Sequence, residues 1–199
     1  MVSTQSERNV LTLTGLPYFE PMELLFGLDA LCVLDDAEVI AFDTETTGLK
    51  PALGGLRLVQ MTADGCPVVV IDMWELSEDD VDTLRKWFAA KQRVWVAHNA
   101  TFDLGWFQTY GIALPGKVHC TMLASRLCTN GMLNLRHGLA SVVERYLKLE
   151  LSKEQQASNW GAQVLSAEQI TYAAKDVVVL SQLYPCLLYT SPSPRDATL

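Results

Sequence analysis

The sequence predicts an α/β domain in which a mixed β-sheet is flanked by helices. Three apolar, β-rich runs, "EVIAFDTE", "GLRLVQMTADG" and "CPVVVIDMW", follow one another, with an Asp-Gly turn signal between the last two. A helical pattern and a fourth strand, "RVWVAH", come next. The C-terminal half is mainly helical, and strands followed by helices in this order favour a sheet with helices on its faces.

The helices follow from caps, charges and periodicity. "SEDDVDTLRKWFAAKQ" begins with a serine cap and an acidic first turn and ends basic, which suits the helix dipole. "NATFDLGWFQTYG" is a second helix that ends at Gly111. Further helices are predicted in "TMLASRLCTNG", "NLRHGLASVVERYLKLE" and "SAEQITYAAKDVVVLSQLYP". Residues 1–30 show no clean period, so we interpret them as an N-terminal extension and residues 31–185 as the domain.

Composition limits the possible classes of protein. The chain has 199 residues, 49% of them hydrophobic, which is enough for one sizeable core. The absence of a long apolar run and of a signal sequence predicts a cytoplasmic protein with no membrane partner. Five cysteines without a C-x-x-C pair favour reduced thiols. A net charge of -8 argues against broad capture of nucleic acid, but not against a nuclease whose carboxylates hold cations.

The tail "CLLYTSPSPRDATL", residues 186–199, differs in kind from the rest of the chain. Its Ser-Pro repeats are compatible with an extended linker. However, "CLLYTSPSPRD" resembles the translation of a widely used transposase sequencing adapter. We therefore predict that residues 186–199 are an artefact and that the natural chain was cut near Pro185.

Two carboxylates stand at the end of the first predicted strand, in "AFDTETTGL". Asp43 and Glu45 are two residues apart, so they project from one face of the strand while Thr44 points away. Carboxylates held this close repel one another and need a proton or a cation between them. A divalent cation with oxygen ligands meets that need, although the same pattern also occurs at solvated strand ends.

Two later segments carry similar signals. In "HNATFD", Asn99 or Thr101 can cap a helix whose first turn contains Asp103, which is also an ordinary acidic helix start. In "YAAKD", Tyr172 and Asp176 lie four residues apart on one helix face. An apolar run follows Asp176, so its carboxylate enters a largely buried helix and needs a partner.

Together, D-x-E, N-x-x-x-D and Y-x-x-x-D resemble in order and spacing the three motifs of the DEDD superfamily of 3'-5' exonucleases, with the tyrosine marking its Tyr-containing branch. The resemblance implies an RNase H-like fold with a five-stranded mixed sheet. "FDTETTGL", "TMLASRL" and "LASVVERYL" look most like the proofreading domain of family A DNA polymerases, the DNA polymerase I type. RNase D-like enzymes more often start D-T-E-F. Cys120 and Asn159 stand where many relatives have Asp, but neither is a metal carboxylate.

The resemblance implies a role for each motif residue. Asp43 would bridge two divalent cations, Mg²⁺ or Mn²⁺. Glu45 and Asp176 would complete the tighter of the two sites, and Asp103 would hold the second cation through water. Tyr172 would orient the attacking water.

Four further residues are implied in substrate binding: Thr44, Thr46, Leu49 and Asn99. The Thr46 backbone, with the side chain of Glu45, would hold the terminal 3'-OH, Leu49 would wedge against the last bases, and Asn99 would support the strand. From the residues alone, Leu49 is equally a core residue and Asn99 equally a helix cap. Trp95, Trp106 and Trp160 sit among apolar residues, so we expect them in the core.

The leading interpretation is therefore a 3'-5' exonuclease acting on single-stranded DNA ends, either alone or with a polymerase domain in the same natural chain. The first alternative is an RNase D-like exoribonuclease, which "TTGL" disfavours. The second is an inactive nucleic-acid-binding module. Such relatives lose metal carboxylates, whereas this chain keeps all four.

Overall fold

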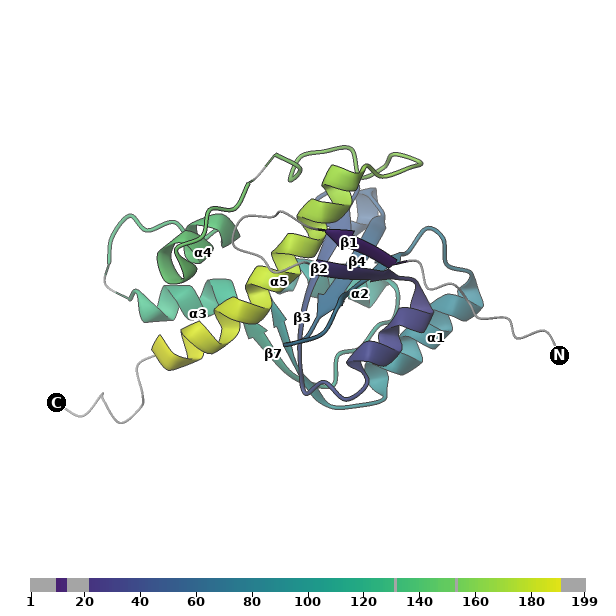
Figure 1. The fold of residues 1–199 in the computed structure, drawn as a ribbon, viewed down its shortest axis with the longest axis horizontal. Coiled ribbons are helices and arrows are strands. Elements are labelled where there is room, and N and C mark those ends of the chain that lie inside the picture. The colour runs from purple at the N-terminus through teal and green to yellow at the C-terminus, as the bar shows by residue number, and fades with distance from the viewer. Residues whose placement is uncertain (1–9, 14–21, 131, 153, 191–199) are drawn as a thin grey trace.

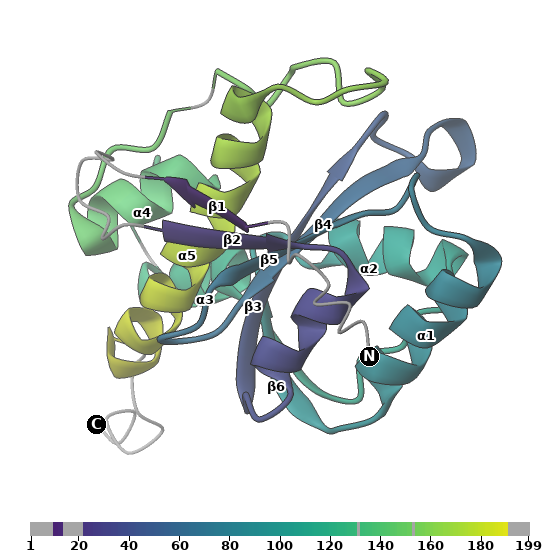
Figure 2. The same cartoon turned by 45° about the vertical axis from the view of Figure 1, so that its right-hand side comes forward.

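The computed structural model describes residues 10–13, 22–130, 132–152 and 154–190, which form a mixed sheet with helices on both faces (Figures 1 and 2). The strand order is β1-β2-β5-β4-β3-β6-β7. The strands are β1 (Val10–Leu13), β2 (Met22–Phe26), β3 (Val39–Thr46), β4 (Leu56–Thr62), β5 (Val68–Asp72), β6 (Arg93–Ala97) and β7 (Gly116–Cys120). The helices are α1 (Glu78–Ala89), α2 (Thr101–Thr109), α3 (Thr121–Cys128), α4 (Leu139–Leu147) and α5 (Ala167–Thr190), with 3-10 turns η1 (Leu28–Leu34) and η2 (Pro51–Leu53).

Strand β3 lies between an antiparallel and a parallel neighbour. It pairs antiparallel with β4 and parallel with β6. Strands β4 and β5 are antiparallel across the Asp-Gly turn, where Gly65 has φ +69°, a conformation that glycine adopts without steric cost. The predicted hairpin is therefore confirmed.

The predicted class, a mixed sheet flanked by helices, is confirmed, but the expected count of five strands is wrong. Seven strands occur in the described residues, because β1, β2 and β7 extend at its edges a sheet of which the sequence identified four strands, β3 to β6. Strand β2 lies within residues 1–30, which we interpreted as an extension, and it pairs parallel with β5. Strand β7, "GKVHC", is short and mostly exposed, so it lacks the apolar pattern that identifies a strand.

Different helices pack on the two faces of the sheet. On one face, α1 and α2 pack through an aromatic core in which Phe42 stacks on Phe107 at 5.4 Å and Phe88 lies 5.3 Å from Trp95. On the other face α5 crosses the strands, and apolar residues of α5, Ala173 and Val177 among them, pack on Leu58. Figure 2 shows α5 on one side of the sheet and α1 and α2 on the other. This packing brings α5 over the central strand.

The termini of several helices follow the predicted chemistry. Ser77 and Asp80 form a reciprocal capping box at α1, and α2 ends before Gly111, whose φ is +65°. Helix α5 continues through Pro185 to Thr190 and does not end where the predicted natural chain does. Leu187, which lies in the predicted artefact, is buried against α4. Residues 191–199 of that tail lie outside the described residues.

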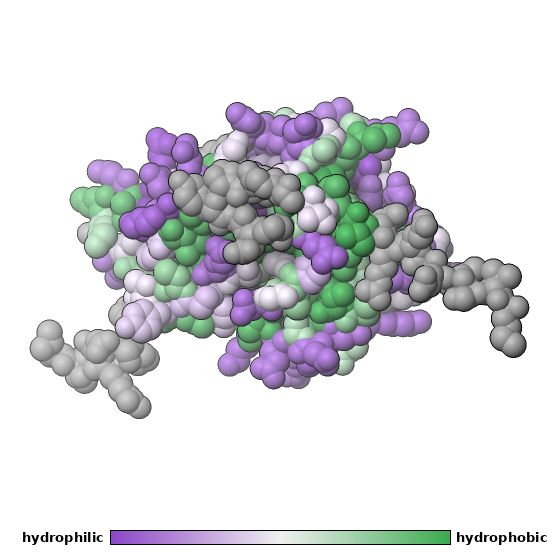
Figure 3. Space-filling view, viewed as in Figure 1, coloured by the Kyte–Doolittle hydropathy of each residue, from purple (hydrophilic) through white to green (hydrophobic). Residues whose placement is uncertain are grey.

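The surface in Figure 3 carries hydrophilic side chains around most of its periphery, with hydrophobic ones gathered over the region of β1 and β2. Val10 and Leu11 of β1 are among the exposed apolar residues. Within the described residues, no helix combines the length and the apolar character that crossing a membrane requires.

Candidate active site

Three of the predicted carboxylates meet between β3 and α5. Ligand oxygens of Asp43, Glu45 and Asp176 all lie within 4.8 Å of one another. Strand alternation places Asp43 and Glu45 on the face that α5 covers, and Asp176 reaches them from the helix. Tyr172, one turn earlier on α5, lies close enough to Asp176 for its hydroxyl to lower the pKa of that carboxyl, against the larger rise that burial causes.

The fourth carboxylate, Asp103, approaches from α2 on the opposite side of β3. Its Oδ1 accepts a hydrogen bond of 2.6 Å from the hydroxyl of Thr44, which points away from Asp43 and Glu45 as predicted. Asp103 is only 1% exposed, and its Oδ2 has no hydrogen-bond partner in the described part of the chain. An oxygen of Asp176, Oδ1, is likewise buried without a partner.

Burial and mutual repulsion raise the pKa values of this cluster. Burial, followed by the charges of Asp103, Glu45 and Asp176, raises the pKa of Asp43 well above its ordinary value. Burial and then the neighbouring carboxylates raise the pKa of Glu45 to about 9. Burial also raises the pKa values of Asp103 and Asp176 to about 7. The cluster therefore binds protons unless a cation replaces them.

The donor set fits divalent cations such as Mg²⁺ or Mn²⁺. All of the clustered ligand atoms are carboxylate oxygens, which hard divalent cations prefer. The unpartnered buried oxygens of Asp103 and Asp176 are groups that normally require a hydrogen-bond donor or a cation. Four neighbouring carboxylates would supply the negative charge that offsets the charge of the cations.

A cleft of about 700 Å³ opens beside these carboxylates. Thr46, Leu49 and Asn99 line it, as does Thr44. Leu49 is 86% exposed, so the core interpretation of this residue is wrong. Asn99 has φ +59°, and the N-cap of α2 is Ala100 without a side-chain cap bond, so Asn99 does not cap that helix. These side chains are therefore placed beside the carboxylates, whereas their contacts with a substrate stay predictions.

One wall of the cleft is fixed by His98, which the sequence did not single out. Its Nε2 lies 2.9 Å from the carbonyl oxygen of His137, and its Nδ1 lies 2.9 Å from the hydroxyl of Thr121. Because a carbonyl only accepts, Nε2 carries a proton. Burial lowers the pKa of His98 to about 4, so the ring is neutral and joins β6 to the segment before α4.

The loop before α5 is fixed by Arg57, which is buried. Its guanidinium pairs with Asp72 at 2.8 Å, stacks on Trp74 at 4.5 Å and donates to the carbonyl oxygen of Ala162 at 2.6 Å. The same loop carries Trp160, whose ring lies 6.5 Å from that of Tyr172. Arg57 therefore helps to hold the loop that covers Tyr172.

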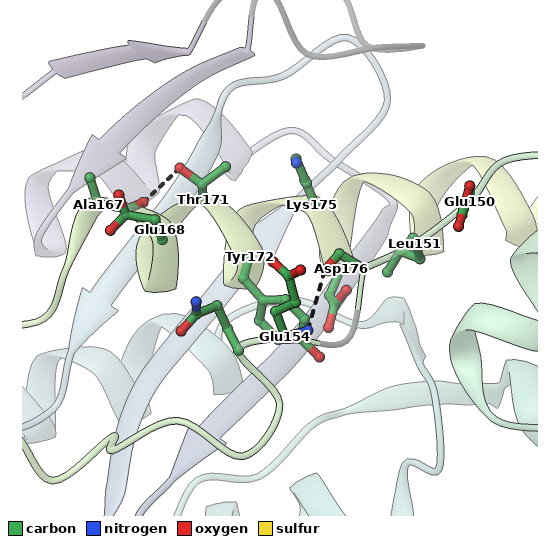
Figure 4. A pocket seen from close by; sticks show the side chains of 11 residues that line it. Glu150, Leu151, Glu154, Ala167, Glu168, Thr171, Tyr172, Lys175 and Asp176 are labelled. Carbon is green, nitrogen blue, oxygen red and sulfur yellow. Dashed lines mark hydrogen bonds between the residues drawn. The ribbon is translucent and has the colours of Figure 1, made fainter.

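A second cavity, of about 630 Å³, is also lined by Tyr172 and Asp176. Figure 4 shows these two side chains projecting from one side of α5, with Glu154 in front of Tyr172 and Lys175 pointing away. The cavity shares both residues with the cleft, so it adjoins the carboxylates.

The core prediction for Trp95, Trp106 and Trp160 is confirmed, since each is at most 4% exposed.

A cluster of acidic side chains at the end of a central strand of a mixed sheet, open to a cleft, is an arrangement that suits the metal-dependent hydrolysis of phosphodiesters. The model of a 3'-5' exonuclease family, that of the exonuclease domain of family A DNA polymerases, matches residues 24–189. The chain belongs to this family of DEDD 3'-5' exonucleases, and the predicted resemblance is confirmed.

The curated relatives include a DNA polymerase and a ribonuclease. The chain is 40% identical to DNA polymerase I of Aquifex aeolicus over 76% of its own length and 24% of that protein. It is 30% identical to ribonuclease D of a Shewanella species over 75% of its own length and 37% of that protein. Brucella melitensis NrnC with bound Mg²⁺ superposes with a TM-score of 0.70 at 30% identity, over 84% of this chain and 81% of that chain. The chain thus spans 24% and 37% of the lengths of these two curated relatives.

Proposed function

We propose that this chain is a two-metal-ion 3'-5' exonuclease domain that releases nucleoside 5'-monophosphates from single-stranded DNA 3' ends. The observation that carries the proposal is the meeting of Asp43, Glu45 and Asp176 in one cluster, with Asp103 beside it, at the edge of an open cleft. Bound divalent cations supply positive charge to the reacting phosphate and make water acidic enough to attack near neutral pH.

The residues of the chain would divide the remaining work. Asp43 would bridge the two cations, Glu45 and Asp176 would complete the tighter site, and Asp103 would hold the second cation through water. Tyr172 would orient the attacking water with its hydroxyl, which lies near Asp176. Its pKa is raised by burial and by the carboxylates, so the hydroxyl keeps its proton and can donate it in a hydrogen bond.

The cleft would hold the 3' end of the strand. The backbone of Thr46 and the carboxylate of Glu45 would bind the terminal 3'-OH, and Asn99 would support the strand. Leu49, exposed at the cleft, would wedge against the last bases. The hydroxyl of Thr44 donates a hydrogen bond to Asp103, so this side chain would hold that carboxylate in place instead of binding substrate as expected.

A DNA substrate and a proofreading role are supported by "TTGL" and by the 40% identity to a DNA polymerase I. The second candidate is an RNase D-like exoribonuclease, which the 30% identity to a ribonuclease D favours. We also propose a cytoplasmic location, to which the free thiols of Cys32, Cys66, Cys120 and Cys186 are suited.

The first experiment compares DNA and RNA single strands of equal length and sequence, labelled at the 5' end, with Mg²⁺ or Mn²⁺. We expect the DNA to shorten one nucleotide at a time, with release of 5'-monophosphates and complete inhibition by EDTA. Faster shortening of the RNA would favour the RNase D-like alternative. No shortening of either strand, together with no Mn²⁺ binding by calorimetry, would favour an inactive binding module.

Mutation tests the assignment of the carboxylates. We expect Asp43→Ala or Asp176→Ala to remove nearly all activity with either cation. Asp36→Ala is the matched control, because Asp36 is an exposed aspartate outside the cleft. Full activity of Asp43→Ala on a single-stranded 3' end would refute the assignment.

The extent of the natural chain is part of the proposal. We propose that residues 186–199 derive from a sequencing adapter and that the exonuclease domain belongs to a longer polymerase. The genomic reading frame beyond the codon for Pro185 tests both statements. A long open frame that encodes other residues supports them, and a frame that reads through "CLLYTSPSPRD" contradicts the adapter origin.

A further inference from the structure

Gln60 lies directly beside the carboxylate cluster, on the strand next to β3. It stands opposite Asp43 in the antiparallel register of β3 and β4, so the two side chains share a face of the sheet. Its Nε2 donates a hydrogen bond of 3.0 Å to Oδ2 of Asp43. Gln60 is fully buried, at 0% exposure.

Packing alone does not account for a glutamine at this position. Leu58, two residues earlier on β4 and on the same face, packs against Ala173 and Val177 of α5. Gln60 is a primary amide in this layer, and its Oε1 has no hydrogen-bond partner among the described residues. A buried amide with an unpartnered oxygen destabilises a fold relative to an apolar side chain of similar size. Methionine would fill the same space without that cost.

The hydrogen bond to Asp43 accounts for the buried amide at this position. Asp43 faces three other carboxylates, Asp103, Glu45 and Asp176, each of which repels its charged form. Its side chain has two rotatable bonds and borders an open cleft, so repulsion favours its rotation away from the cluster. The N–H of Gln60 fixes Oδ2 and leaves the other oxygen and the remaining lone pairs for cations.

We propose that Gln60 is a positioning residue, whose amide holds the Asp43 carboxylate in the orientation that binds divalent cations. This inference rests on the proposed function, since it assumes that Asp43 is a metal ligand. Donors that orient metal-binding side chains typically affect metal affinity by about 10- to 100-fold when removed. A side chain with a merely structural role would change the stability of the protein and leave its metal affinity unchanged.

The test uses Gln60→Met, which keeps the volume of the side chain and removes the donor. Mn²⁺ binding is measured by calorimetry, and the Tm is measured in EDTA. We expect the dissociation constant for Mn²⁺ to rise about 10-fold or more, while the metal-free Tm is unchanged or higher. Activity should fall most at low Mn²⁺ and recover in part at high Mn²⁺.

Thr62→Val is the matched control. Thr62 lies on the same strand and face as Gln60 and is also buried, but its hydroxyl contacts the backbone carbonyls of Ala63 and Cys66 rather than a carboxylate. We expect this variant to lower the Tm and to bind Mn²⁺ as the wild type does. If Gln60→Met does not fold, Gln60→Asn replaces it, because asparagine keeps the amide but withdraws it by one methylene group.

The outcomes separate this inference from the proposed function. Wild-type Mn²⁺ affinity in Gln60→Met, or a loss no larger than in Thr62→Val, overturns the positioning role alone. Absence of Mn²⁺ binding by the wild-type protein overturns the proposed metal site itself. Weaker Mn²⁺ binding at an undiminished metal-free Tm supports the inference.

Discussion

Neutralising Glu45 should stabilise the metal-free protein, although it removes a proposed ligand. The ordinary pKa of this carboxyl is 4.5, and burial with the charges of Asp176 and Asp103 raises it to about 9 in the fold. Between these two values the native state holds a proton that the unfolded chain releases. The free energy of unfolding therefore falls as the pH rises through this range. Glu45→Gln removes that dependence, because glutamine is neutral at every pH.

The magnitude follows from the pKa shift. A pH of about 8 lies about 3.5 units above the ordinary pKa of Glu45. At about 1.4 kcal/mol per unit, the wild type loses about 5 kcal/mol of its free energy of unfolding over this interval. This value is an upper limit, because water in the open cleft solvates part of the charge. We expect Glu45→Gln to raise the free energy of unfolding by roughly 1–3 kcal/mol, which is a rise in Tm of roughly 3–10 °C.

Urea unfolding of wild type and variant in EDTA, at about pH 4.5 and about pH 8, measures this effect. The gain should be present at the higher pH and nearly absent at the lower one. Glu144→Gln, at an exposed position on α4, is the control and should change stability by less than about 0.5 kcal/mol at either pH. Saturating Mn²⁺ should reverse the order, since the wild type gains more from the cation. If metal-free Glu45→Gln is no more stable than the wild type at about pH 8, the conclusion that burial and neighbouring charges make Glu45 destabilising is refuted.

Three further outcomes are expected. Tyr172→Phe should lower the exonuclease rate without abolishing Mn²⁺ binding, as single-turnover assays and calorimetry would show; loss of binding would contradict a role limited to water. Thr44→Val removes the hydrogen bond that lowers the pKa of Asp103, so the acidic limb of the pH-rate profile should move to higher pH; an unmoved profile would contradict it. Arg57→Met leaves Asp72 without its buried partner, so the free energy of unfolding in urea should fall by about 3 kcal/mol. The exonuclease rate should also fall, because Arg57 holds the loop that carries Trp160. Wild-type stability of the variant would contradict this role of Arg57.

The parts of the fold that the sequence predicted are those that local chemistry determines. The turn at Gly65, the Ser77 cap and the end of α2 before Gly111 each depend on a few adjacent residues. The edge strands depend on distant partners instead. Strand β2 becomes a strand by pairing with β5, and its apolar residues alone are compatible with several structures. The short β7 has too little apolar character to be distinguished from a loop.

The candidate site was predictable for a similar reason. The i, i+2 spacing of Asp43 and Glu45 and the i, i+4 spacing of Tyr172 and Asp176 fix which side chains share a face, whatever the rest of the fold does. Bringing Asp176 to β3 required the family motifs, because spacing along the chain does not determine which strand a helix crosses. The roles of Gln60 and Arg57 could not be predicted from the sequence, because each contacts a residue of another strand or loop.

The position of each carboxylate explains how the fold tolerates their repulsion. Asp43 and Glu45 belong to a strand paired on both sides. Asp103 lies in the first turn of α2, which packs on an aromatic core. Asp176 is carried by α5 between Ala173 and Val177, which are fully buried on the sheet. Relieving the repulsion by moving a backbone would expose these apolar contacts, so side-chain rotation and protonation are the responses that cost least. Both are opposed by a bound cation and by a donor such as Gln60, and this is why we expect metal affinity to depend on residues that contact no substrate.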